Sequence, residues 1–141
     1  MLRLDGIVFK NYYGKVAYHK LFKLSSHLIF MNILIIKIGA LGDVVRTSFI
    51  AQALKDKYKG QDIKIFWITS KKATTLFINN PYVDKVISEE DKESLLKENF
   101  DLVINLEEDL ENAKLVSSLK SKKIIGTFLN SGGKIDYTPE T

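Results

Sequence analysis

Apolar residues after position 30 come in short runs that alternate with amphipathic segments. The first run, Asn32 to Ile38, is nearly continuous and rich in isoleucine, which predicts a strand buried on both faces of a parallel sheet. Residues 44–58 then follow helical spacing, and Gly60 is a stop signal. The segment between them, Gly39 to Asp43, is therefore expected to be the turn of a strand–turn–helix unit.

The same rhythm continues to the end of the chain. Further strands are predicted at 63–69, 85–87, 101–106 and 123–127, helices at 70–79, 91–98 and 109–120, and a loop at 130–134. No element is expected at 137–141, so the chain is predicted to stop without a terminal element. Strands that alternate with helices indicate an α/β fold with a Rossmann-like, doubly wound parallel sheet.

Residues 1–30 differ from residues 31–141, and a boundary is expected near Met31. The first thirty residues are aromatic and hold five basic residues and one acidic residue, whereas the rest has 16 of each. The net charge of +4 therefore belongs to the extension and does not predict that the body binds nucleic acid.

Composition narrows the chemistry of residues 31–141. The chain has no cysteine, and both of its histidines lie in the first thirty residues. A thiolate nucleophile, a histidine-containing triad and a histidine-rich metal site are therefore excluded from the body. No apolar run approaches the roughly 20 residues of a membrane span. One domain with a buried core suits a chain of 141 residues.

The turn Gly39, Ala40, Leu41, Gly42, Asp43 is the first candidate site, because ligands of open α/β sheets bind beyond the carboxyl ends of the strands. Two glycines three apart let backbone approach a ligand closely. The spacing is neither the dinucleotide fingerprint nor a P-loop. An aspartate at a helix start would repel a phosphate, so it is expected to face a hydroxyl or a cation.

Asp43, Arg46 and Thr47 each have a structural and a functional interpretation. Asp43 could cap the helix through Val45 or Arg46, and a capping carboxylate still has a second oxygen free. Arg46 could hold an anionic acceptor or be a solvated surface residue. Thr47 could be a site residue or a packed hydroxyl.

Other polar clusters favour structural roles. The lysines at 71 and 72 could meet a phosphate or carboxylate but better suit a solvated helix start, and the acids at 107–109 suit a helix dipole. Three adjacent acids cannot all point at one metal ion, so no metal site is predicted. The 131–133 loop contains two glycines and could close over a ligand, but most such loops are turns.

The body resembles family 9 glycosyltransferases, the heptosyltransferases that build the inner core of lipopolysaccharide. The resemblance lies in the G-x-x-G-D turn and in the order of six segments: NILIIKIGALGDVVRTS, ALKDKY, IKIFWITS, NNPYVDKVI, FDLVINLEED and KKIIGT. It covers residues 31 to about 138, and the family has no counterpart of residues 1–30.

The resemblance implies the amino-terminal half of a GT-B enzyme, in which two Rossmann-like domains face each other across a cleft. Residues 31–141 would be the acceptor-side domain, truncated before the carboxyl-terminal domain that binds the nucleotide-sugar donor, ADP-heptose. Asp43 would be the general base of an inverting transfer, beside Gly39 to Gly42, Arg46 and Thr47. No cofactor or metal is implied. The implied setting is the cytoplasm, with a lipid-linked sugar acceptor and peripheral contact with the inner membrane.

Alternatives stay open at this point. The chain could be a nucleotide-binding or regulatory Rossmann module without chemistry, or a truncated, inactive product. Residues 1–30 could be a start-site artefact or disordered segment, or a basic amphipathic helix that attaches to an anionic membrane surface, with apolar residues at 17, 21, 24 and 28.

Overall fold

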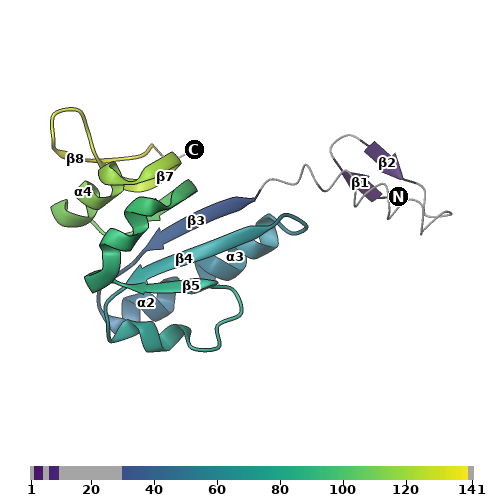
Figure 1. Ribbon diagram of the computed structural model, residues 1–141, viewed down its shortest axis with the longest axis horizontal. Helices are drawn as coiled ribbons and strands as arrows, with labels where there is room; N and C mark the ends of the chain where they lie inside the picture. Colours follow the sequence, from purple (N-terminus) through teal and green to yellow (C-terminus); the bar gives the residue numbers. More distant parts are fainter. Residues whose placement is uncertain (1, 5–6, 10–29, 140–141) are drawn as a thin grey trace.

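The computed structural model describes residues 2–4, 7–9 and 30–139. Near the amino terminus, strands β1 (Leu2–Leu4) and β2 (Ile7–Phe9) pair antiparallel (Figure 1). The amphipathic helix considered for the extension falls on residues outside the described ones.

A six-stranded sheet forms the body. Its strands are β3 (Met31–Ile36), β4 (Ile63–Thr69), β5 (Lys85–Ser88), β6 (Asn99–Asn105), β7 (Lys120–Leu129) and β8 (Ile135–Tyr137), in the order β5-β4-β3-β6-β7-β8. The first five run parallel, and β8 is antiparallel to β7. The predicted α/β, Rossmann-like fold is confirmed.

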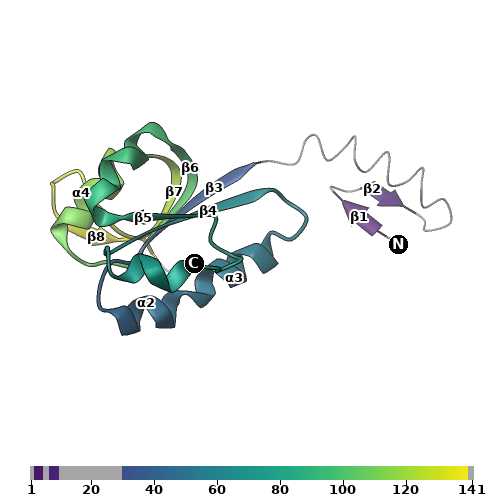
Figure 2. The same ribbon diagram turned by 60° about the horizontal axis from the view of Figure 1, so that its bottom comes forward.

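Helices cover both faces of this sheet, as the two views show (Figures 1 and 2). One face holds α2 (Leu41–Thr47), α3 (Phe49–Lys57) and the 3₁₀ helix η2 (Ala73–Phe77), and the other holds the 3₁₀ helix η3 (Glu89–Lys97) and α4 (Leu110–Ser118). Within the described residues, no helix has the length and apolar character to cross a bilayer.

Two apolar layers form because β3 is buried on both faces. Ile33 and Ile35 pack with Val44 and Trp67 on the side of α2 and α3. Leu34 and Ile36 pack in the second cluster, with residues of η3 and α4. This two-sided burial explains why the first strand is a nearly continuous apolar run.

Several predicted boundaries were wrong. The helix expected at 44–58 begins at Leu41 and is divided at Ser48 into α2 and α3. The helix expected at 91–98 is the 3₁₀ helix η3, with non-helical backbone at Asp91. Strand β7 starts at Lys120, directly after α4, three residues earlier than predicted.

The expectation of no element at 137–141 was wrong at its first residue, because Tyr137 ends strand β8, which was not predicted. Residues 130–134 form a tight hairpin turn that leads into β8. Gly133 has φ 73°, and its N–H donates to the carbonyl of Asn130 at 2.9 Å. Asn130 in turn receives on its side-chain oxygen the N–H groups of Gly132 at 3.0 Å and Lys134 at 3.1 Å. The loop is therefore a structural turn.

The strand order creates a topological switch point. The chain passes from β3 outward to β4 and β5, then returns to the other side of β3 with β6 and β7. The carboxyl ends of β3 and β6 therefore lie where the order of the strands reverses. Ligands of open α/β sheets bind at this position.

Gly126 is the glycine that β7 requires, because its φ is 99° and an added Cβ would lie 2.0 Å from the carbonyl oxygen of Asn105 on β6. We expect Gly126→Ala to lower the free energy of unfolding by about 3 kcal/mol or more, measured by urea denaturation. Gly133→Ala is the control, since its Cβ would meet nothing within 4 Å; it should cost about 1–2 kcal/mol. Equal losses would contradict this account.

Asp101 ties the amino-terminal edge of the sheet together. Its carboxylate receives the N–H of Asn32 at 2.8 Å and lies 2.8 Å from the ammonium of Lys122. Burial opposes ionisation, but the Lys122 and Asn32 contacts outweigh it, so the pKa of Asp101 lies below its usual value. The ionised form is therefore favoured by folding. Its contribution is complete above the unfolded pKa of about 3.9 and is lost as the pH falls through the folded pKa.

Asp101→Asn should consequently lower the free energy of unfolding at pH 7 by about 1–2 kcal/mol. The difference from wild type should narrow below pH of about 4, as Asp101 becomes protonated in the wild-type protein. Urea titrations between neutral and acidic pH measure this. Asp56→Asn on the exposed face of α3 is the control. A difference that stays constant with pH would exclude the ionic contribution of Asp101.

Candidate functional site

The Gly39–Asp43 turn lies at the switch point, directly after β3. Ala40 has extended backbone (φ −57°, ψ 145°) and is the N-cap of α2, with its carbonyl accepting the N–H groups of Asp43 at 2.9 Å and Val44 at 3.1 Å. Leu41 and Gly42 are consequently the first two residues of the helix. The turn is shorter than predicted, because the helix begins inside it.

The two glycines of the turn do not bend it through positive φ, which among described glycines occurs only at 60, 126 and 133. A Cβ on Gly42 would meet nothing within 4 Å, and one on Gly39 would lie 3.5 Å from a carboxylate oxygen of Glu107. Their effect is to leave the backbone of the turn uncovered, which permits the close approach of a ligand.

Asp43 lies in the first turn of α2, and its interpretation as the cap of this helix was wrong because Ala40 occupies that position. Its Oδ1 pairs with Nη2 of Arg46, one turn further along the helix. The Asp43 side chain is 40% exposed and that of Arg46 78% exposed. Arg46 is thus a surface arginine that binds the carboxylate of its own helix and still has solvent access for an anion.

Thr47 uses its hydroxyl within the helix. The hydroxyl donates to the carbonyl of Asp43 at 2.8 Å and lies 3.1 Å from that of Val44. This contact supports the interpretation of a packed hydroxyl, and it fixes the backbone just beneath Asp43.

Glu107, at the end of β6, holds the start of the turn. One of its oxygens, Oε1, accepts the N–H groups of Ile38 at 2.6 Å and Gly39 at 2.9 Å. The same oxygen lies 3.3 Å from the ammonium of Lys37, and these two side chains are only 16% and 14% exposed. The helix-dipole role expected for Glu107 was therefore wrong.

Two buried polar residues support Glu107 from behind. The side-chain oxygen of Asn105 accepts the N–H of Glu107 at 3.1 Å, and its amide nitrogen donates to the Thr127 hydroxyl at 2.7 Å. That hydroxyl donates to the Glu107 carbonyl. Both residues are at most 2% exposed. Sequence reasoning missed this network, although a polar residue that ends an otherwise apolar strand was a signal for it.

Asp109 has a structural role at the start of a helix, as expected for the acidic cluster, but it acts as a cap. It is the N-cap of α4 and accepts the backbone N–H and the side-chain amide of Asn112, each at 2.8 Å. Burial opposes its ionisation, but these hydrogen bonds outweigh burial and lower the pKa of Asp109 below its usual value. Glu108, which lies between Glu107 and Asp109 in the sequence, is exposed.

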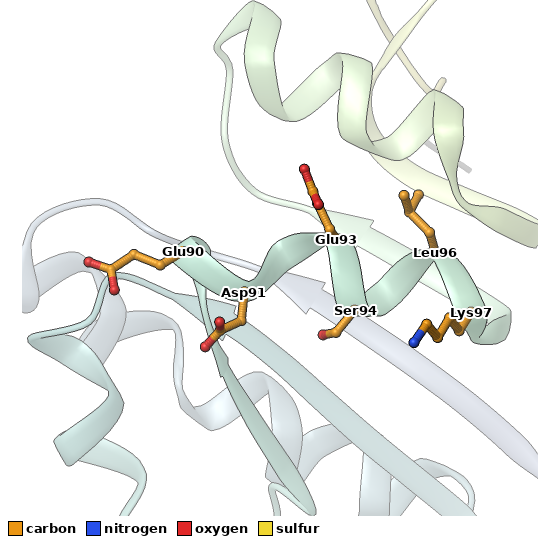
Figure 3. A pocket seen from close by; sticks show the side chains of 6 residues that line it. All are labelled: Glu90, Asp91, Glu93, Ser94, Leu96 and Lys97. Atoms are coloured by element: carbon orange, nitrogen blue, oxygen red, sulfur yellow. The ribbon is translucent and has the colours of Figure 1, made fainter.

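The remaining candidates are not drawn into the turn. Lys71 pairs at 3.2 Å with Glu90 on the surface, and Lys72 is exposed at the start of η2, as expected for a solvated helix start. A surface depression lies along η3 (Figure 3), lined by Glu90, Asp91, Glu93, Ser94, Leu96 and Lys97. Its lining comes from one helix alone, so it does not join the elements that meet at the switch point. Residues 2–4, 7–9 and 30–139 contain no group of three or more acidic, histidine or cysteine side chains placed to hold a metal ion.

Comparison with known proteins relates the chain to one group of enzymes. It is 30% identical over 112 residues to lipopolysaccharide heptosyltransferase 1 of Campylobacter coli. The match covers 72% of this chain and 32% of that protein. The chain thus spans about one third of the length of this relative. No protein-family profile matches it.

Solved structures share the fold. The E. coli heptosyltransferase WaaC with ADP has a TM-score of 0.58 and 22% identity, over 68% of this chain and 35% of that one. WaaC with ADP-2-deoxy-2-fluoro heptose has a TM-score of 0.58 and 20% identity, over 68% and 36%. A family 9 glycosyltransferase from Veillonella parvula DSM 2008 has a TM-score of 0.59 and 21% identity, over 68% and 31%.

Replacing Thr127 by Val tests the network behind Glu107. The change keeps the volume but removes the hydroxyl that Asn105 and Glu107 share, so the free energy of unfolding should fall by about 1–3 kcal/mol in urea titrations. Thr75→Val removes an exposed hydroxyl bonded to the Lys72 carbonyl within η2, and it should change stability by less than about 0.5 kcal/mol. If the two variants were equally stable, the network would have no energetic role.

Proposed function

Because its sequence and fold relate this chain to the heptosyltransferases of glycosyltransferase family 9, we propose that residues 31–141 form the acceptor-side domain of a GT-B glycosyltransferase. The alignment to lipopolysaccharide heptosyltransferase 1, at 30% identity over 112 residues, carries this proposal. The chain spans about a third of that relative, so the donor domain is assigned to a carboxyl-terminal part that this chain does not contain. Residues 1–30 are a separate extension in this scheme.

The proposed reaction transfers a sugar from a nucleotide-sugar to a hydroxyl of the acceptor. The hydroxyl oxygen attacks the anomeric carbon, the bond from that carbon to the diphosphate breaks, and the nucleoside diphosphate leaves with the bonding electrons. A single displacement of this kind inverts the anomeric centre. The hydroxyl proton needs a base, because an alcohol is a weak nucleophile until its proton is removed.

Asp43 is the proposed base. It lies at the carboxyl edge of the sheet, beside the switch point, and is 40% exposed. Arg46 binds its Oδ1, whereas Oδ2 has no hydrogen-bond partner among the residues that the structure describes. One oxygen is thus held in place while the other can accept a proton. The uncovered backbone of Gly39, Ala40, Leu41 and Gly42 and the side chains of Arg46 and Thr47 complete the proposed acceptor surface.

The proposed substrates follow from the relatives. WaaC has been solved with ADP and with a fluorinated ADP-heptose, so ADP-heptose is the proposed donor. A lipid-linked sugar of the lipopolysaccharide core is the proposed acceptor, which the protein would meet in the cytoplasm at the inner face of the membrane. Peripheral contact there would suffice.

Asp43→Asn tests the proposed base in a protein that joins this chain to the carboxyl-terminal part of its relatives. Asparagine keeps an oxygen for Arg46 but cannot take a proton, so kcat should fall roughly a hundred- to ten-thousandfold with little change in KM. Radiolabelled transfer from ADP-heptose measures this. Asp91→Asn on η3 is the control and should keep full activity. Wild-type turnover by Asp43→Asn at neutral pH would disprove the assignment.

The chain of residues 1–141 alone should fold but should not transfer sugar. Its sheet and two apolar layers bury a core, whereas the proposed donor site lies outside it. A cooperative thermal transition, together with no product from ADP-heptose and a core acceptor, is the expected result. Product formed by the purified chain would show that it contains a complete active site.

A further inference from the structure

The Gly39 turn already contains an anion. The successive N–H groups of Ile38 and Gly39 both point to Oε1 of Glu107, at 2.6 and 2.9 Å. Converging N–H groups of successive residues form a concavity that binds anions. In α/β domains that bind nucleotides, the turn between the first strand and its helix receives a phosphate. Here the carboxylate of Glu107, two residues beyond β6, accepts two N–H groups of this turn.

The donors around Glu107 would also suit a phosphate. Besides the two N–H groups, the ammonium of Lys37 lies 3.3 Å from Oε1. The site is built and not fortuitous, because the Glu107 side chain is 16% exposed and its backbone is held by Asn105 and Thr127. An incoming phosphate would meet two N–H groups that are already bonded and a cation that is already paired.

We propose that Glu107 is a specificity-determining residue that closes this turn to nucleotide phosphates. Its carboxylate uses the donors that a phosphate would need and repels a second anion nearby. A neutral sugar hydroxyl has no such conflict and can approach Asp43 from the uncovered side of the turn. The inference rests on the proposed function for its meaning, since it explains how a Rossmann-like domain could serve the acceptor and leave the donor to the other domain.

Titration of the ¹⁵N-labelled chain of residues 1–141 with magnesium-free ADP tests this by NMR. In the wild type, the amide signals of Ile38 and Gly39 should show no saturable shift. In Glu107→Ala they should shift saturably, with a dissociation constant about tenfold or more below the highest ADP concentration that leaves the wild type unshifted. Inorganic phosphate should reproduce the shifts and adenosine should not. Glu108→Ala removes the neighbouring exposed acid and should behave as wild type.

Two further variants secure the result. Glu107→Gln keeps an acceptor for the two N–H groups but loses the charge, so its affinity for ADP should lie between wild type and Glu107→Ala; it also replaces Glu107→Ala if that variant does not fold. Adding Lys37→Met to Glu107→Ala should remove the gained affinity. Saturable ADP binding at Ile38 and Gly39 in the wild type, or no gain in a folded Glu107 variant, would overturn the inference. Wild-type binding of ADP at other residues would instead contradict the donor assignment of the proposed function.

Discussion

The bond from the Glu107 carboxylate to the backbone of Ile38 and Gly39 is the contact on which the proposed site depends. It joins the end of β6 to the chain just after β3, across 69 and 68 positions of sequence. The two strands are paired up to Ile36 and Asn105, so Glu107 extends their register beyond the sheet. Asn105 and Thr127 add β7 to the same assembly. Three strand ends are thereby fixed relative to one another.

This constraint determines where α2 begins. With residues 37–39 held by Glu107, Ala40 caps the helix with its backbone, and Asp43 lies in the first helical turn. The ion pair with Arg46 then orients one carboxylate oxygen. The proposed base is consequently fixed by local helix geometry, and the helix itself by a long-range contact. A half-site held in this way suits the proposed enzyme, in which a second domain would supply the donor.

Local sequence patterns predicted much of this fold but not the contacts that complete it. The apolar runs of β3, β4 and β6 predicted parallel strands because burial on both faces requires such runs. The turn at Gly39 was predicted because it lies between the apolar run of a strand and a segment with helical spacing. Glu107 was misassigned because a local rule, the helix dipole, competes with a partner that only the folded sheet brings near. Strand β8 was missed because three residues pair with β7 only after the Asn130–Lys134 turn has formed.

Hydrogen exchange of the Ile38 and Gly39 amides tests the central claim most directly, because it reports on the two bonds to Glu107 themselves. In the chain of residues 1–141, both amides should exchange much more slowly than expected for an unprotected loop, and approach the protection of Leu34 in β3. Glu107→Ala should remove the protection of these two amides while Leu34 stays protected. Unprotected exchange of Ile38 and Gly39 in the wild type would contradict the account, because the turn would then not be held by Glu107.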